Sequence, residues 1–171
     1  MDFISHVLIG RILAFYKDYS RKSIALIILF SIMADIPQIF LYAYLGYLKL
    51  RLLWIPLNVD WVGFRDASWA VTFLWEIPHS FIFLFVVVLP IVIYFKLPRI
   101  AFVAYFSHLF LDLFTHTGEW AVKPLFPLGY TFPGFADVWA WSVYSLMFLW
   151  LTLTLVILIL QRYLRRKKKK V

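Results

Sequence analysis

The chain has 171 residues, of which 64% are hydrophobic and 21% aromatic, and its mean hydropathy is +0.85. A soluble domain of this length cannot bury so much apolar surface, so the composition predicts an integral membrane protein with residues 1–171 as one membrane domain. The absence of cysteine excludes disulfides and thiolate metal sites. Any metal site must use His, Asp, Glu or backbone oxygen, which favours zinc or a harder divalent ion.

The net charge of +8 is concentrated at the C-terminus. The segment 161–171 carries seven basic residues directly after an apolar run: Arg162, Arg165, Arg166 and Lys167 to Lys170. Such a tail is typical of a cytoplasmic anchor that faces anionic lipids. No basic folded face accompanies it, so we expect membrane lipids as partners and no nucleic acid.

The N-terminal stretch 1–16 predicts a short helix, with Ser5 as the residue that caps it. It is shorter than the ~20 residues that span a bilayer. His6 on this helix is either a metal ligand or an ordinary polar residue at a helix interface. The first long apolar segment, 24–47, contains Asp35 near its middle. A carboxylate at that depth is costly unless it is paired, protonated or bound to a metal, and Pro37 should break the helix there.

Residues 48–75 are expected to form a loop. Its tryptophans suit a belt at the membrane interface: Trp54, Trp61, Trp69 and Trp75. A second apolar run ends near Phe95, and Pro78 suits the first turn of its helix. His79 would then lie at the start of that helix, three residues after Glu76.

The remaining apolar runs predict helices over 100–116 and 139–160, joined by a loop over 118–138. The fold class is therefore an all-α bundle of about four transmembrane helices plus the short N-terminal helix. Basic residues before the first long helix, at Lys96 and Arg99 and in the tail favour the cytoplasm. This orientation places the loops 48–75 and 118–138 on the outer side.

Polar residues recur at regular intervals along the helix predicted over 100–116. His108, Asp112 and His116 are spaced i, i+4, i+8 and so form one stripe on an otherwise apolar helix. At 1.5 Å rise per residue, the ends of the stripe stand ~12 Å apart. Either a neighbouring pair chelates an ion while the third residue supports it, or the stripe serves more than one metal.

The four histidines, together with Asp35 and Asp112, are typical of zinc or two-metal hydrolytic sites. Glu76 or Glu119 is a candidate general base, and the sequence does not choose between them. Two other interpretations remain open. The stripe is either a polar network that ties helices together or a relay for protons or ions.

The block Ser107–Gly118, with Pro124-Leu125-Phe126-Pro127 after it, resembles the signature of the YdjM-like family, described as LexA-regulated, membrane-bound, metal-dependent hydrolases of bacteria and archaea. Three further segments resemble family motifs in the same order: Ser5-His6 with Gly10, Asp35-Ile36-Pro37, and His79-Ser80. The chain departs from the family where Ala34 replaces a frequent Pro and Pro37 a frequent second Asp. It also lacks the His-Arg that often precedes His79-Ser80.

This resemblance implies a protein of a bacterial or archaeal cytoplasmic membrane. The charge pattern predicts a cytoplasmic C-terminus, and the resulting topology places His79 and His116, and so the site, toward the outer half of the bilayer. The family is grouped remotely with zinc-dependent phospholipase C and P1-type nucleases, which implies a phosphoester substrate. The membrane setting favours a lipid. The missing second Asp implies one carboxylate ligand fewer than the family pattern.

The resulting expectation is a membrane-bound, metal-dependent hydrolase of a phosphoester. Its cofactor is one or more divalent ions, with zinc favoured. The expected metal ligands are His6, Asp35, His79, His108, Asp112 and His116. The expected catalytic residues are Asp112, His116 and Glu76. The alternative is a non-enzymatic membrane protein in which the same His/Asp cluster is a relay or a structural element.

Overall fold

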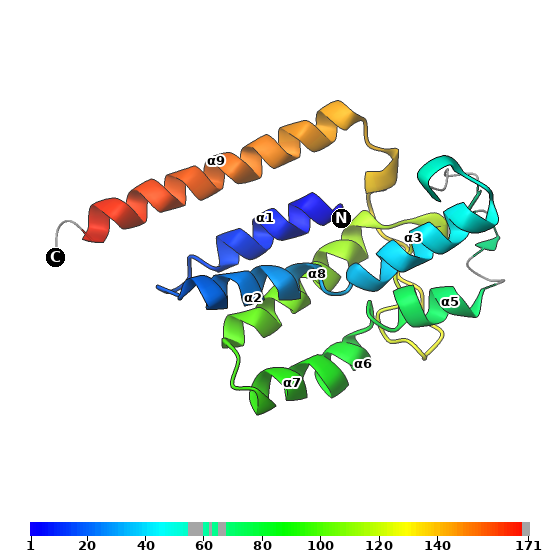
Figure 1. The fold of residues 1–171 in the computed structure, drawn as a ribbon, viewed down its shortest axis with the longest axis horizontal. Helices are drawn as coiled ribbons and strands as arrows, with labels where there is room; N and C mark the ends of the chain where they lie inside the picture. The colour runs from blue at the N-terminus through cyan, green and yellow to red at the C-terminus, as the bar shows by residue number, and fades with distance from the viewer. Residues whose placement is uncertain (55–59, 62, 65–67, 169–171) are drawn as a thin grey trace.

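A computed structural model of the chain describes residues 1–54, 60–61, 63–64 and 68–168 (Figure 1). Over these residues the protein is all-helical, without a strand, as the sequence predicts. The N-terminal helix α1 (Phe3–Leu13) is capped by Asp2, not by Ser5 as expected. The Asp2 carboxylate accepts hydrogen bonds from the Ser5 backbone N–H at 3.0 Å and from the Ser5 hydroxyl at 2.5 Å. An acceptor one turn earlier therefore places Ser5 inside the helix.

The first long apolar segment is two helices, α2 (Arg21–Ile32) and α3 (Ile36–Leu48), bent by 48° at the break between them. Pro37 lies in the first turn of α3. Proline has no N–H to donate and its fixed φ suits this position, so it starts a helix here and prevents one continuous span. Asp35 lies in the break and directly precedes α3.

The expected loop 48–75 ends in helical structure. Helix α5 (Trp69–Val71) continues into a π-helical turn, Thr72–Glu76. After a break bent by 56°, helix α6 (Phe81–Phe83) leads through a second π-helical turn, Leu84–Val88, to helix α7 (Leu89–Tyr94).

Ser80 caps α6, since its hydroxyl accepts from the Ile82 N–H at 3.1 Å. Pro78 and His79 therefore lie in the turn before the helix and not in its first turn as predicted.

Helix α8 (Arg99–Thr115) crosses the middle of the molecule, and the long helix α9 (Val143–Lys168) lies beside α1 (Figure 1). Among the described residues, one helical segment, Val143–Arg166, is by itself long and apolar enough to cross a membrane. There are up to three such spans if each bent pair counts as one. The bundle of about four spanning helices remains a prediction.

Two apolar clusters pack the interior. One joins α2, α7 and α8 through residues that include Ile27, Val92 and Leu109. The other joins α3 to the segment 69–76 through residues that include Leu41 and Trp75.

Two of the four tryptophans expected in an interfacial belt are buried in the interior instead. Trp61 and Trp75 are buried in the second cluster, whereas Trp54 and Trp69 are exposed. The reason is aromatic packing: Trp61 and Trp75 both contact the Trp120 ring edge-on, and burying these large rings outweighs an interfacial position.

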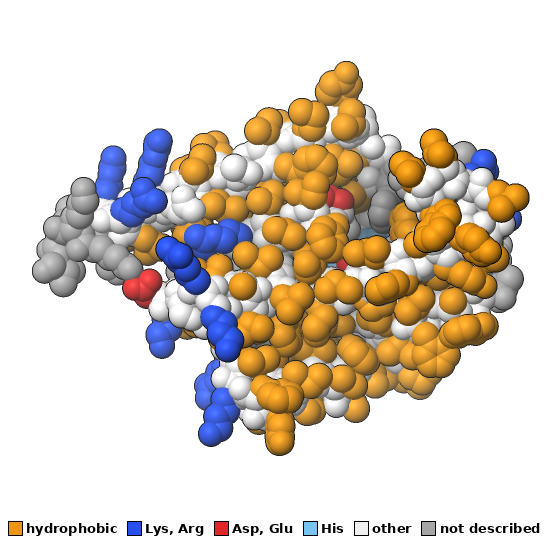
Figure 2. All heavy atoms as spheres, in the orientation of Figure 1, with side chains coloured by type: hydrophobic (Ala, Val, Ile, Leu, Met, Phe, Trp, Pro, Cys, Tyr) orange, Lys and Arg blue, Asp and Glu red, His pale blue; other side chains and the backbone are white. Residues whose placement is uncertain are grey.

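Apolar side chains cover much of the face in Figure 2, while most of the Lys and Arg side chains visible there gather at one end. This end holds the last turns of α9 and the connections α1–α2 and α7–α8 (Figures 1 and 2). Arg11, Lys17 and Arg165 line one cavity there. Segments that the charge pattern assigns to one side of the membrane thus lie at one end of the fold.

Candidate metal centre

Four buried side chains from three parts of the chain meet at the centre of the molecule. Asp35 comes from the break between α2 and α3, His79 from the turn before α6, and His108 and Asp112 from one face of α8. Each offers one ligand atom, and these atoms all lie within 4.8 Å of one another. A divalent ion needs such a convergence of nitrogen and oxygen ligands.

The distances within the group are short. The Nε2 atoms of His79 and His108 are 3.3 Å apart. Asp112 Oδ2 lies 3.1 Å from the Nε2 of His108 and 3.5 Å from that of His79. Asp35 Oδ1 lies 3.4 Å from the Nε2 of His79 and 3.5 Å from that of His108. Two imidazoles and two carboxylates therefore face one small volume.

Backbone carbonyls determine which nitrogen of each imidazole faces this volume as an acceptor. His79 Nδ1 lies 2.8 Å from the Trp75 carbonyl, and His108 Nδ1 lies 2.8 Å from the Ser31 carbonyl. A carbonyl oxygen only accepts, so both Nδ1 atoms donate, and each neutral ring has its lone pair on Nε2. When both rings are neutral, the facing Nε2 atoms are therefore both acceptors.

The group thus collects acceptors without enough donors. Asp112 Oδ2 is buried and has no hydrogen-bond partner within the described part of the chain. Buried acceptors that face one another are costly unless a cation lies among them. The four ligand atoms, two imidazole nitrogens and two carboxylate oxygens, fit a divalent metal. The Nδ1–H···O=C hydrogen bonds are of the kind that orients metal-binding histidines.

The other carboxylate oxygen of Asp112 faces a second set of groups. Asp112 Oδ1 lies 3.0 Å from His6 Nε2 and 3.6 Å from His116 Nδ1, and the Met1 ammonium donates to it. The His6 ring also stacks on the His108 ring, with centroids 3.8 Å apart. His6 and His116 therefore lie outside the set of four, where His116 contacts the group through Asp112 and His6 contacts it through both Asp112 and His108.

His116 reaches Asp112 because α8 ends just before it. It is the C-terminal cap residue of α8, and its backbone is extended. Gly134 packs against this backbone: a Cβ on Gly134 would lie 2.1 Å from the His116 carbonyl oxygen. The loop after α8 therefore positions His116, whereas the i, i+4, i+8 spacing predicted it on the helix itself.

Glu76 is buried and forms an ion pair with Lys123, whose Nζ lies 2.5 Å from Glu76 Oε1. The structure thus places this candidate general base against a lysine and outside the group of four. The side chain of Glu119, the other candidate, lies outside the described residues.

Sequence reasoning missed the residues that hold the ligands in place. The Trp75 and Ser31 carbonyls orient the two histidines, and backbone groups leave no signal in a sequence. Tyr105 donates its hydroxyl to the Pro78 carbonyl at 2.7 Å and so holds the turn that carries His79. The sequence did carry a signal for Tyr105: it precedes His108 by three residues, and this spacing places both side chains on one face of α8, near the candidate ligands.

Comparison with family models, with curated proteins and with solved structures found no match for this chain. The resemblance to the YdjM-like family therefore rests on the motifs alone. The geometry of the four side chains supports a metal site independently of that resemblance.

Proposed function

We propose that the protein is a membrane-bound, metal-dependent hydrolase of a phosphoester, with a lipid as the favoured substrate. The observation that carries this proposal is the convergence of two imidazole lone pairs and two carboxylates in a buried site. The motif resemblance supports the choice of phosphoester chemistry. The basic end of the molecule supports a cytoplasmic C-terminus with the site toward the outer half of the membrane. The motif resemblance is what favours a bacterial or archaeal membrane.

In this proposal Asp35, His79, His108 and Asp112 hold the ion, and zinc is favoured by the His/carboxylate set. A bound divalent ion supplies a water that ionises near neutral pH and a positive charge opposite an attacked phosphoryl oxygen.

The chain's own residues then orient and exchange protons. Asp112 joins the two halves of the site, because its Oδ2 faces the group of four and its Oδ1 faces His6 and His116. His116 is the candidate for proton transfer at the outer edge of the group. Glu76 is the weaker candidate, since it is paired with Lys123 and lies outside the group of four.

Elemental analysis of detergent-purified protein tests the metal site. We expect about one or more divalent ions per chain in the wild type, and loss of the ion in Asp112→Ala because the variant removes an acceptor from the centre of the group. Asp18→Asn is the matched control, since Asp18 is exposed on the connection between α1 and α2, and it should keep the ion.

Hydrolysis of bis(p-nitrophenyl) phosphate by the loaded protein, followed by a phospholipid screen, tests the activity. No ion in the wild type after zinc or manganese is added back would contradict the metal site and favour a polar network or relay. A bound ion without hydrolysis of any phosphodiester would contradict the enzyme and favour a metal with a structural role.

A further inference from the structure

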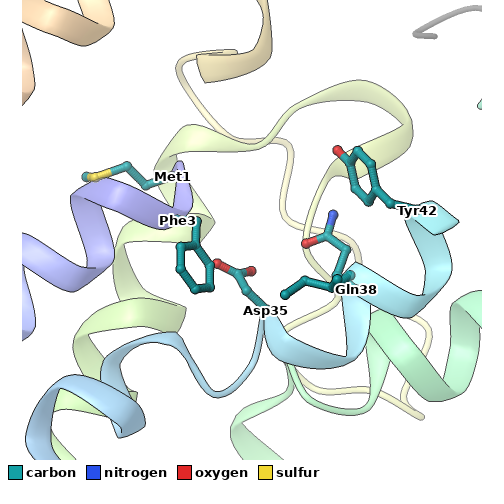
Figure 3. Close-up of a pocket in the computed structure, with 6 residues that line it drawn as sticks. Met1, Phe3, Asp35, Gln38 and Tyr42 are labelled. Atoms are coloured by element: carbon teal, nitrogen blue, oxygen red, sulfur yellow. The ribbon is translucent and has the colours of Figure 1, made fainter. Parts of the chain in front are cut away.

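A cavity of about 330 Å³ opens next to the candidate metal centre, between the start of α1 and the first turns of α3 (Figure 3). Six residues line it: Met1, Phe3, Asp35, Gln38, Ile39 and Tyr42. Asp35 belongs both to this lining and to the group of four. A molecule in the cavity therefore contacts the metal centre through the wall that Asp35 forms.

Gln38 is the polar side chain in this cavity that the metal site does not explain. It follows Asp35 by three residues, so both lie on one face where α3 begins, and Figure 3 shows its amide between Asp35 and Tyr42. The residue is 7% exposed, and its Nε2 has no hydrogen-bond partner among the residues that the structure describes. A buried amide without an acceptor is costly, so this N–H donor is available to a ligand oxygen.

Phe3 and Ile39 give the cavity apolar walls, and the cavity borders an apolar surface. Phe3 is 40% exposed and Ile39 56% exposed, and Phe40, the next residue of α3, is 66% exposed. In a membrane protein such a surface contacts acyl chains. A ligand that enters past Ile39 therefore comes from the bilayer, with its chain along the apolar wall.

The size of the cavity sets how much of a lipid it takes. Ligand pockets span ~300–1,000 Å³, so this one is at the small end. It accommodates a head-group ester and the adjoining part of one chain, while the remainder of the chain stays in the bilayer.

We propose that this cavity is a phospholipid-binding site in which the Gln38 side-chain amide donates a hydrogen bond to a head-group oxygen beside Asp35. This inference rests on the proposed function for its choice of a phosphoester head group. It assigns Gln38 as a positioning residue and makes a bilayer phospholipid, not a soluble phosphoester, the ligand of the cavity.

Photocrosslinking in nanodiscs tests the site without requiring turnover. The probe is phosphatidylglycerol with a diazirine near the ester end of one acyl chain, and labelled residues are located by mass spectrometry. We expect labelling of the cavity wall at Phe3 and Ile39, reduced about tenfold in Gln38→Leu, because hydrogen bonds to charged groups are worth about that factor in binding. Gln161→Leu, which changes the other glutamine, should label as the wild type does.

A cavity-filling variant and a competition experiment with inorganic phosphate complete the test. Ile39→Trp should fill the cavity and abolish labelling while metal content stays at the wild-type level, which also shows that the variant is folded. Excess inorganic phosphate should not compete. Equal labelling in Gln38→Leu, labelling confined to other surfaces, or full competition by phosphate would overturn the proposal, the last in favour of a soluble phosphate ligand.

The same experiment separates this proposal from the enzyme proposal. Labelling of the cavity in a protein that hydrolyses no phosphodiester would support the lipid site and contradict the hydrolase. Hydrolysis of bis(p-nitrophenyl) phosphate without labelling of the cavity would support the hydrolase and contradict the lipid site.

Discussion

At the scale of single residues, the candidate metal centre depends on hydrogen bonds made away from it. His79 and His108 each donate Nδ1–H to a backbone carbonyl, and this holds both Nε2 lone pairs toward the carboxylates. A histidine without such a partner would rotate or exchange tautomers, which lowers its value as a ligand. The atoms that determine the chemistry of the site are thus partly main-chain atoms of Trp75 and Ser31.

Tyr105→Phe tests this support at one residue. The variant removes the hydroxyl that donates to the buried Pro78 carbonyl and leaves that carbonyl unsatisfied, at a cost of ~1–3 kcal/mol in the free energy of unfolding. We expect a lower melting temperature in detergent and weaker binding of the divalent ion, since the turn that carries His79 loosens. Tyr144→Phe is the control, because Tyr144 is 80% exposed. If both variants melt and bind alike, Tyr105 has no supporting role.

At the scale of helices, each bent pair contributes one ligand at its break. Asp35 follows α2, and His79 precedes α6, so neither ligand lies inside a regular helix. In a continuous helix, the helical periodicity would fix the direction of each of these side chains, and neither would have to point toward α8. A break lets the chain turn a short segment toward α8, and in a membrane such irregular backbone is tolerated where it is buried in protein.

The packing of α1 on α2 places His6 beside Asp112. Gly10 makes this possible, because a Cβ at this position would lie 2.3 Å from the Ser31 hydroxyl. That hydroxyl donates to the His6 carbonyl at 2.9 Å, and the Ser31 carbonyl accepts from His108. The close contact of Gly10 with Ser31 therefore supports both His6, which lies beside the metal centre, and His108, which is one of its candidate ligands.

Gly10→Ala should force α1 and α2 apart and move His6 away from Asp112. We expect the free energy of unfolding to fall by ~1–3 kcal/mol, as is typical of overpacked cores, which lowers the melting temperature. We also expect weaker metal binding. Gly129→Ala is the control, since a Cβ there would meet nothing within 4 Å. Wild-type metal affinity in Gly10→Ala would show that the approach of α1 is irrelevant to the site.

At the scale of the whole molecule, most of the basic side chains visible in Figure 2 gather at one end, and the loop 118–138 lies away from it. The predicted topology places Tyr16 on the cytoplasmic side and Tyr130 on the outer side, with three crossings between them. Both side chains are exposed, at 81% and 55%.

The chain has no cysteine, so an introduced cysteine is its sole thiol. Tyr130→Cys should react with a membrane-impermeant maleimide in intact cells, and Tyr16→Cys only after the cells are permeabilised. The cysteine-free wild type is the control. Labelling of both positions from the same side would show that the number of crossings between them is even and that the four-span topology is wrong.

Much of this architecture was available from the sequence by itself. Composition alone indicates a helical membrane protein, and the all-helical class is confirmed over the described residues. The spacing of His108 and Asp112 indicates that they share a face of one helix, because residues four apart meet on any α-helix. Pro37 indicates a break near Asp35, because proline cannot donate a helical hydrogen bond.

Only the tertiary structure decided which polar residues form one group. It brings Asp35 and His79 to α8, turns His6 and His116 to the other oxygen of Asp112, and pairs Glu76 with Lys123. Apart from the contact of His116 with Asp112, four residues away, these contacts join segments far apart in the chain, and they depend on helix breaks, a glycine contact and backbone carbonyls. Local spacing carries no information about these long-range contacts, because it records which residues share a helix face and not which faces meet.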